Sequence, residues 1–278
     1  MTINCKGELI DLSTPKVMGI MNITPDSFFD GGAYNEESKL LNQVDKMLTD
    51  GATFIDIGGY SSKPNAAAVT EEEELNRIVP AVKLILKRFP DVLLSIDTFR
   101  STVAAVCLDH GAAMINDISA GKLDDRMLEV VAKYNVPYIM MHMRGTPQSM
   151  QENVAYNDVV KESIAYFAER VAAARSLRIN DLIIDPGFGF AKTLEHNYEI
   201  LQKLKVYELL KLPLLVGVSR KSMIQKGIQV TANDALNGTT VLNTIALMNG
   251  ASILRVHDVK EAVEAVKLFN LLNYEYEI

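Results

Sequence analysis

Eight short apolar runs recur along the chain, and each ends in polar or ionisable residues before a helical pattern begins. Apolar runs of this length are typical of parallel strands that are buried on both faces. Strands that alternate with helices are joined by right-handed crossovers, so the pattern predicts an α/β fold. The runs are Val17–Asn22, Phe54–Gly59, Val92–Asp97, Ala113–Asp117, Val136–His142, Leu182–Asp185, Leu214–Ser219 and Ile253–His257.

The helical pattern is clearest in Leu75–Leu86, where apolar residues recur three and four positions apart and form one buried stripe. Thr70 precedes this segment and Glu73 follows three residues later, which is the form of a capping box. We interpret the acidic run Glu71–Glu74 as helix capping and solvated surface, because carboxylates stabilise the positive end of a helix.

An open doubly wound sheet would share these strand–helix units. The chain has no Gly-x-Gly-x-x-Gly fingerprint, however, and its 278 residues suit one (β/α)8 TIM barrel, which typically has about 250 residues. No linker rich in Pro, Gly or Ser divides the chain, so we predict a single domain over residues 1–278. Residues 2–13 alternate in polarity around Lys6–Gly7 and predict an N-terminal β-hairpin, which we expect to cover the bottom of the barrel.

Composition argues against several classes of protein. The net charge of −7 disfavours a surface for nucleic acid. Cys5 and Cys107 are too few and too far apart for a disulfide framework or a zinc site, and a reduced, cytoplasmic protein is the simpler interpretation. No run approaches the roughly 18 apolar residues that a membrane span requires, and residues 1–15 lack the apolar stretch of a signal peptide.

The carboxyl ends of the eight runs carry the candidate chemistry. In a barrel these ends meet on one face, where the active sites of barrel enzymes lie. This face would collect Asn22, Asp97, Asn116, His142, Asp185, Lys221, Arg255 and His257. The long segments 22–34 and 60–70 follow two of the strand ends, and we interpret them as lids or binding loops rather than as surface decoration.

Two kinds of binding group are combined on this face. The two aspartates, with Asn116 and Lys221, would suit a flat heterocycle that offers several N–H groups, whereas a single Asp could serve as a structural cap. Arg255 and His257 point the same way on the last strand and would attract an anion. For His142, among methionines, we favour a packing role. The residues indicate a barrel enzyme for a planar, phosphorylated substrate, without a serine triad or a His-x-x-x-His metal pair, and they do not name the reaction.

The motifs of these segments resemble those of the dihydropteroate synthases, the pterin-binding enzymes of the folate pathway. Their first two signatures are matched by MGIMNITPDSFFDGG at 18–32 and DIGGYSSKPNA at 56–66. The others are matched in the same order by SIDTFR (95–100), NDISAG (116–121), MHMRGTP (141–147), DPGFGFAKTLEHN (185–197), GVSRKSMI (217–224) and RVHDVKEA (255–262). The likeness covers nearly the whole chain, and so many matched motifs make it highly specific.

The resemblance implies a transferase of folate biosynthesis. Such an enzyme joins 6-hydroxymethyl-7,8-dihydropterin diphosphate to p-aminobenzoate and gives 7,8-dihydropteroate and pyrophosphate, and we expect an SN1-like displacement. The resemblance further implies Mg²⁺ as the cofactor, with Asn22 as the metal residue, and a homodimer without nucleic-acid or membrane partners.

The resemblance also assigns residues to each part of the two substrates. The catalytic residues would be Asp97, Asp185 and Lys221. The pterin would be held by Asp97, Asn116, Asp185, Phe190 and Lys221. The diphosphate would be bound by Asn22, Lys63, Arg255 and His257. The p-aminobenzoate pocket would be shaped by Ser62, Lys63, Pro64, Phe190, Lys221 and Ser222.

The second loop departs from the commonest pattern of the resembled family. Many members read Glu-Ser-Thr-Arg-Pro-Gly where this chain has YSSKPN at 60–65. Lys63 keeps the charge of Arg but loses its bidentate fork, and Asn65 tolerates a positive φ better than most residues do. Sulfonamides mimic p-aminobenzoate, so these changes motivate the hypothesis of an altered sulfonamide sensitivity. Ala191, where Gly is common, is a milder departure.

Two other functions stay open at this stage. A pterin-binding methyltransferase domain that serves a corrinoid protein would share the pterin residues, but it would have no use for the loop 61–65 or for the diphosphate set. A non-catalytic pterin-binding protein would keep the fold without turnover, and pyrophosphate release from the two substrates would exclude it.

Overall fold

The protein is built around one closed sheet of parallel strands. The computed structural model describes residues 1–23, 33–60, 69–152 and 154–272. Eight strands are paired in the order β8–β7–β6–β5–β4–β3–β10–β9, and a parallel bridge between Ile184 and Leu214 joins the two ends of this order. The strands are β3 (Lys16–Asn22), β4 (Phe54–Gly58), β5 (Leu93–Asp97), β6 (Met114–Asp117), β7 (Tyr138–Met141), β8 (Leu182–Asp185), β9 (Leu215–Val216) and β10 (Ile253–Val256).

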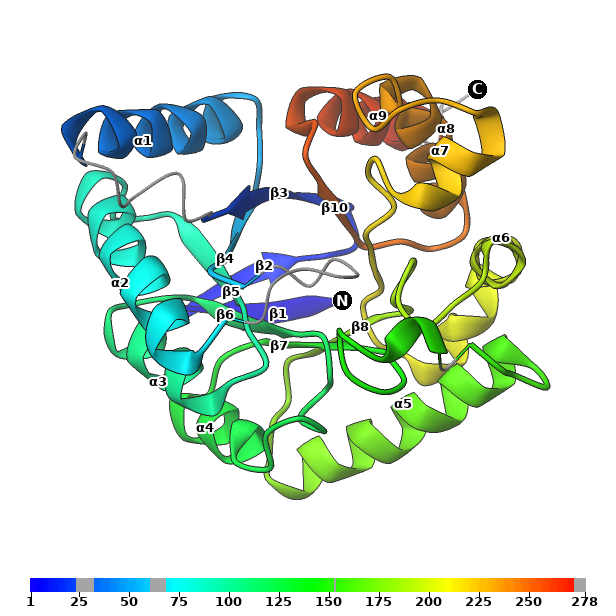
Figure 1. Ribbon diagram of the computed structural model, residues 1–278, viewed down its shortest axis with the longest axis horizontal. Coiled ribbons are helices and arrows are strands. Elements are labelled where there is room, and N and C mark those ends of the chain that lie inside the picture. Colours follow the sequence, from blue (N-terminus) through cyan, green and yellow to red (C-terminus); the bar gives the residue numbers. More distant parts are fainter. Residues whose placement is uncertain (24–32, 61–68, 153, 273–278) are drawn as a thin grey trace, which may run out of the picture.

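Helices alternate with the strands and form a ring around the barrel (Figure 1). They are α1 (Ala33–Thr49), α2 (Glu71–Arg88), α3 (Ser101–Asp109), α4 (Met127–Tyr134), α5 (Val159–Ser176), α6 (Leu194–Gln202), α7 (Ser222–Ile228), α8 (Leu236–Met248) and α9 (Val259–Leu272), with 3-10 turns η2 (Met150–Glu152) and η3 (Leu204–Leu210). Among the described residues, no helix combines the length and the apolar character of a membrane span.

The predicted TIM barrel is confirmed, and each of the eight apolar runs overlaps one strand. The six residues predicted for the seventh strand are too many. β9 has only two residues, because the chain turns where the backbone N–H of Lys221 donates to the carbonyl of Val218.

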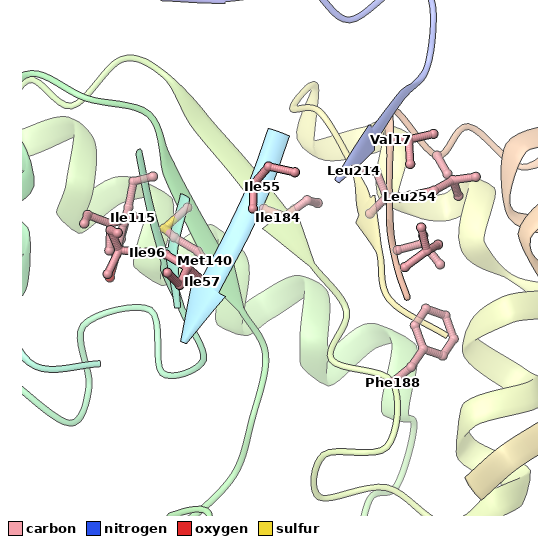
Figure 2. Packing of buried hydrophobic residues seen from close by; sticks show 14 of the residues in the cluster. Val17, Ile55, Ile57, Ile96, Ile115, Met140, Ile184, Phe188, Leu214 and Leu254 are labelled. Carbon is pink, nitrogen blue, oxygen red and sulfur yellow. The ribbon is translucent and has the colours of Figure 1, made fainter. Parts of the chain in front are cut away.

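Side chains alternate between the outer and the inner face of each strand. The outward residues pack beneath the helices, and Figure 2 labels Val17, Ile55, Ile57, Ile96, Ile115, Met140, Ile184, Leu214 and Leu254 among them. At the amino-terminal ends of the strands the inward residues form a second cluster, here called the floor. Each strand supplies one floor residue, and these are Met18, Phe54, Leu93, Met114, Ile139, Ile183, Leu215 and Ile253.

The N-terminal hairpin covers the floor, as predicted. β1 (Thr2–Cys5) and β2 (Glu8–Asp11) pair antiparallel across Lys6–Gly7. The buried side chains of Ile3, Cys5 and Leu12 belong to the same cluster as the floor residues. The hairpin therefore buries apolar side chains that the open end of the barrel would otherwise expose to water.

The acidic start of α2 is only partly as predicted. Thr70 caps the helix and both halves of the capping box with Glu73 are present. Glu74, in contrast, is fully buried and forms an ion pair with Arg100, so its assignment to the solvated surface is wrong. The physical reason is that Arg100, which precedes α3, supplies a cation on the inner side of α2, and a paired carboxylate can be buried there.

Candidate active site

The inner wall of the barrel becomes polar directly above the floor. Because side chains alternate along a strand, the residue two positions after each floor residue also points inward. On five strands this second position carries a polar side chain, and these residues are Asp56 on β4, Ser95 on β5, Asn116 on β6, Asp185 on β8 and Arg255 on β10. On β5 the third position is Asp97. The carboxyl end of the barrel is therefore a polar mouth.

Arg255 connects three of the strands in this mouth. Its Nε donates to Oδ2 of Asp56 at 2.6 Å, and its Nη2 donates to Oδ2 of Asp97 at 2.7 Å. Asn116 Nδ2 donates to the same oxygen of Asp56 at 3.0 Å. The other oxygen of Asp56 is buried and has no hydrogen-bond partner among the described residues. One guanidinium thus pairs with two carboxylates from neighbouring strands.

Burial disfavours the charged form of both predicted catalytic aspartates. It raises the pKa of Asp97 above its usual value, although the Arg255 guanidinium opposes the shift. It also raises the pKa of Asp185, opposed mainly by the ammonium of Lys221. Carboxylates in such a dry site gain most from a ligand that donates N–H groups to them.

Lys221 interacts with the charge of Asp185 and stands near the aromatic ring of Phe190. Its Nζ donates to the carbonyl of Phe188 at 2.6 Å and stands 5.0 Å from the centre of the Phe190 ring. Burial lowers the pKa of Lys221 to about 8, while Asp185 acts in the opposite direction. This ammonium can therefore donate a hydrogen bond and also release its proton within a moderate pH range.

An apolar wall stands beside the polar mouth. It consists of a separate cluster of buried residues, against which partly buried aromatic and aliphatic side chains pack. The cluster contains Ile118, Met141, Met143, Met150 and Ala191, with Phe99, Leu123 and Phe190 packed against it. A polar mouth with an apolar wall suits a flat heterocycle, whose edge needs hydrogen bonds and whose faces need van der Waals contact.

The predicted anion-binding residues lie further out. Asn22 and His257 are exposed at the ends of β3 and β10, which are neighbours in the barrel. The His257 ring is held by Ser219, whose Oγ lies 3.2 Å from Nδ1. Ser222 is exposed at the start of α7 and lines a cavity of about 260 Å³ together with Gly189 and Lys192. Arg255 is deeper, so it joins the anion end to the aspartates.

Three predicted residues lie outside the described part of the chain. Ser62, Lys63 and Pro64 belong to the segment 61–68, and most of the segment 22–34 is also outside it. His142 is described, and its ring packs in an aromatic cage with Tyr156, Tyr166 and Phe167. Burial lowers the pKa of His142 to about 2, which agrees with the predicted packing role.

Sequence reasoning missed two buried charges. Asp56 interrupts an apolar strand, and its place two residues after Phe54 is the signal that could have found it, because a charge on the inner face of a barrel strand requires a partner. Lys192 is 4% exposed and lies at the end of the loop that follows β8. No periodicity indicates its burial, since it stands in irregular structure.

The donor chemistry of the described residues bears on the metal site predicted at Asn22. Within the described ranges there is no group of three His, Cys, Asp or Glu side chains that could hold a metal ion. Mg²⁺ is commonly bound by one or two protein oxygens together with substrate phosphates and waters. The exposed amide of Asn22, beside the anion-binding residues, fits that mode of binding.

Comparison with known proteins agrees with this geometry. The family described as "Pterin binding enzyme" matches residues 18–257. A dihydropteroate synthase of Escherichia coli is 44% identical over 270 residues, which are 96% of this chain and 95% of the relative. The chain belongs to the dihydropteroate synthase family.

Solved structures of the family show the same fold. The dihydropteroate synthase of Yersinia pestis in complex with a sulfonamide drug has a TM-score of 0.91 and 43% identity, with 98% of this chain and 99% of that chain covered. The enzyme of Xanthomonas albilineans with 4-aminobenzoic acid has a TM-score of 0.90 and 35% identity, with 99% of each chain covered. The predicted family, fold and enzyme class are confirmed.

Proposed function

We propose that this chain joins 6-hydroxymethyl-7,8-dihydropterin diphosphate to p-aminobenzoate, with release of pyrophosphate and formation of 7,8-dihydropteroate. The observation that carries the proposal is the convergence of Asp97, Asn116, Asp185 and Lys221 around one polar mouth. Family membership supports it, as does the structure of a relative with 4-aminobenzoic acid.

In this proposal the pterin enters the mouth edge-on. The carboxylates of Asp97 and Asp185 accept hydrogen bonds from its ring N–H groups, while Asn116 and Lys221 offer donors to its acceptors. The methionine-rich wall contacts one face of the ring. Burial raises the pKa of both aspartates, because it removes water from their carboxylates. A ligand that donates hydrogen bonds to these carboxylates replaces the lost water and stabilises the ionised forms.

The diphosphate would lie above Arg255, toward His257 and Asn22, and Lys63 is proposed as a further cation from the second loop. When bound by Asn22 and the diphosphate oxygens, Mg²⁺ would neutralise charge on the leaving group. Arg255 pairs with Asp56 and Asp97 in the structure. When the pterin donates hydrogen bonds to the Asp97 carboxylate, the Arg255 guanidinium can pair with the diphosphate instead.

The bond changes require little from the protein beyond positioning and charge. The methylene C–O bond breaks, and its electron pair leaves with pyrophosphate. The electron-rich dihydropterin carries the resulting positive charge, which Asp97 and Asp185 stabilise electrostatically. The neutral amine of p-aminobenzoate then forms the C–N bond, and its surplus proton passes to solvent. The neutral amine needs no strong base, so the proposed reaction does not depend on a nucleophile–base pair.

The p-aminobenzoate would lie between Phe190 and the start of α7. Phe190 and Lys221 stand 5.0 Å apart, from ring centre to Nζ, and the cavity beside Ser222 opens next to them. Ser62, Lys63 and Pro64 are proposed to complete this pocket. In this proposal the arylamine approaches the methylene carbon once the C–O bond has largely broken, which is the order of bond changes in an SN1-like displacement.

The deciding experiment mixes the protein with both substrates and Mg²⁺ and measures pyrophosphate and dihydropteroate. We expect stoichiometric formation of both products, and neither when p-aminobenzoate or the diphosphate is omitted. Pterin binding without pyrophosphate release would instead indicate a non-catalytic pterin-binding protein. Methyl transfer from methyltetrahydrofolate would indicate the corrinoid-linked alternative.

We further propose that the protein is a homodimer that pairs through α8 and α9. Val241 and Met248 on α8 are 50% and 67% exposed, and Leu268 and Leu272 on α9 are 65% and 78% exposed. These helices border a cavity of about 620 Å³, whose lining includes Met248, Leu268 and Leu272. Apolar faces of this kind are typical of subunit interfaces. Light scattering should give a dimer mass, and a monomer for the double variant Val241→Glu, Met248→Glu.

We also propose a cytoplasmic location. Cys5 and Cys107 are both free and buried, and burial raises the pKa of each thiol to about 12. Thiols of this kind suit a reducing compartment. Fractionation of the native host, with the protein detected by antibody, tests the location.

A further inference from the structure

Lys192 carries a buried charge that the proposed reaction has not used. Its side chain is 4% exposed, and its Nζ donates to the carbonyl of Phe190 at 3.0 Å and to that of His142 at 3.2 Å. An ammonium group loses strong hydration when it is buried, so such a lysine requires partners that compensate for it.

The partners of Lys192 belong to the turn that connects Asp185 to α6. The backbone N–H of Gly187 donates to Asp185 Oδ1 at 2.8 Å, and Lys221 binds the carbonyl of Phe188. A Cβ at Gly187 would lie 2.2 Å from the carbonyl oxygen of His142, so the turn is pressed against the end of β7. Lys192 binds that same oxygen and therefore fastens the turn where it touches the strand.

The turn contains Ala191, whose backbone conformation is strained. Ala191 has a φ of 49°, in the left-handed region that disfavours residues with a Cβ. Ala191 is also fully buried, in the apolar wall of the site. The bond from Lys192 to the carbonyl of Phe190 spans Ala191 and opposes relaxation of its backbone.

Lys192 also adds a positive charge beside the carboxylates of the mouth. Arg255 pairs with Asp56 and Asp97, while Lys221, Arg255 and Lys192 all favour the ionised form of Asp185. The groups whose charge Asp185 feels are Lys221 after β9, Arg255 on β10 and Lys192 itself, and Asp185 acts in turn on Tyr207 of η3.

The charge of Lys192 depends on the same neighbour. Burial lowers the pKa of Lys192 to about 7, and the like charges of Lys221 and Arg144 act in the same direction. The carboxylate of Asp185 opposes all three effects. Asp185 and Lys192 thus favour each other's ionised form.

We propose that Lys192 is a positioning residue, which fastens the Phe190 turn to the end of β7 and balances the carboxylate of Asp185. The inference rests on the proposed function, in which Phe190 borders the p-aminobenzoate and Asp185 binds the pterin. It predicts two separable effects, one of position on the arylamine and one of charge on the pterin.

Three substitutions separate these effects. Lys192→Arg keeps charge and donors, Lys192→Gln keeps a donor without charge, and Lys192→Met removes both. Lys205→Met, on the exposed face of η3, is the matched control. Thermal melting identifies any variant that fails to fold. If Lys192→Met does not fold, Lys192→Gln is used in its place.

Two measurements follow on the folded variants. Binding of 6-hydroxymethylpterin, which has no leaving group, is titrated by fluorescence over pH. Pterin binding should weaken at low pH as Asp97 and Asp185 take up protons, and the apparent pKa of this acid limb belongs to the two carboxylates together. We expect this pKa to rise by about one unit in Lys192→Gln and Lys192→Met but not in Lys192→Arg. The KM for p-aminobenzoate should rise about tenfold in Lys192→Met, with a smaller change in kcat.

The outcomes distinguish this inference from the proposed function. An acid limb that stays unchanged in both Lys192→Gln and Lys192→Met, in proteins that bind the pterin normally, would overturn the role of Lys192 and leave the proposed function intact. Failure of the unsubstituted protein to bind the pterin at any pH would overturn both.

Discussion

The two ends of the barrel interior share the same eight strands and have opposite chemistry. At the floor each strand contributes an apolar side chain and the N-terminal hairpin covers them. Two residues further along, five of the strands carry Asp56, Ser95, Asn116, Asp185 and Arg255 instead. One step of the strand alternation therefore separates a region that stabilises the fold from a region that binds substrate.

This difference between floor and mouth shows how the protein can bury polar groups whose desolvation is not fully offset by hydrogen bonds or ion pairs. The floor, the outer shell and the hairpin supply the hydrophobic burial, so the mouth does not have to stabilise the fold. Its aspartates have raised pKa values, and one oxygen of Asp56 has no partner among the described residues. Such arrangements cost stability and are typical of functional sites.

The largest expected effect comes from the floor. Phe54→Ala should lower the free energy of unfolding by about 3–5 kcal/mol, because Phe54 is fully buried and its loss leaves a cavity between the strands and the hairpin. Denaturant unfolding measures this loss. Below the melting transition, pterin affinity should stay near its original value. A large loss of affinity in a folded variant would contradict the division between floor and mouth.

The mouth should respond in the opposite way. Asp97→Asn should reduce kcat by about 10²-fold or more, since it removes a carboxylate that faces the developing positive charge. Its free energy of unfolding should change little, because burial already disfavours the ionised carboxylate. Steady-state kinetics and denaturant unfolding check the two statements. Asp125→Asn, at an exposed carboxylate, is the control, and turnover of Asp97→Asn equal to that control would refute the role.

The pH dependence sharpens the comparison further, because the titrating groups of the site lie in the mouth. Ionised Asp97 and Asp185 are required, and burial raises their pKa values, so activity should increase with pH through a limb above the usual carboxyl range. Protonated Lys221 is also required, and its pKa of about 8 predicts a descending limb there. The profile of kcat/KM should therefore be bell-shaped.

Lys221→Arg isolates the descending limb. A guanidinium does not lose its proton below about pH 12, so the alkaline limb should disappear even if the rate is lower. Lys205→Met should keep the bell shape. A limb that persists near pH 8 in Lys221→Arg would assign it to another group.

The sequence predicts the barrel well because the barrel depends on periodicity. Each of the eight apolar runs overlaps a strand, and the alternation in residues 2–13 predicts the hairpin. The site residues on strands were predicted for the same reason, since a strand end defines where its side chain points. Asp97, Asn116 and Arg255 are brought together by pairing of β5, β6 and their neighbours.

The sequence does not show which charged side chains form ion pairs with each other. Glu74 and Arg100 are 26 positions apart, and Asp56 and Arg255 are 199 apart, so no local pattern predicts either pair. The burial of Lys192 follows from the path of a turn rather than from a repeat. The pairing of charges depends on tertiary contacts, which periodicity does not encode.

The smallest expected effect concerns the arylamine end of the mouth. Lys63 and Asn65 stand where the motif that the second loop resembles has Arg and Gly. An ammonium offers a point charge instead of a planar fork, so contacts to a carboxylate or a sulfonyl group should weaken about two- to tenfold. The double variant Lys63→Arg, Asn65→Gly should therefore shift the sulfonamide inhibition curve while pterin affinity stays constant. Coincident inhibition curves would show that these positions do not set drug sensitivity, and a parallel change in pterin affinity would show that the second loop acts on the whole mouth.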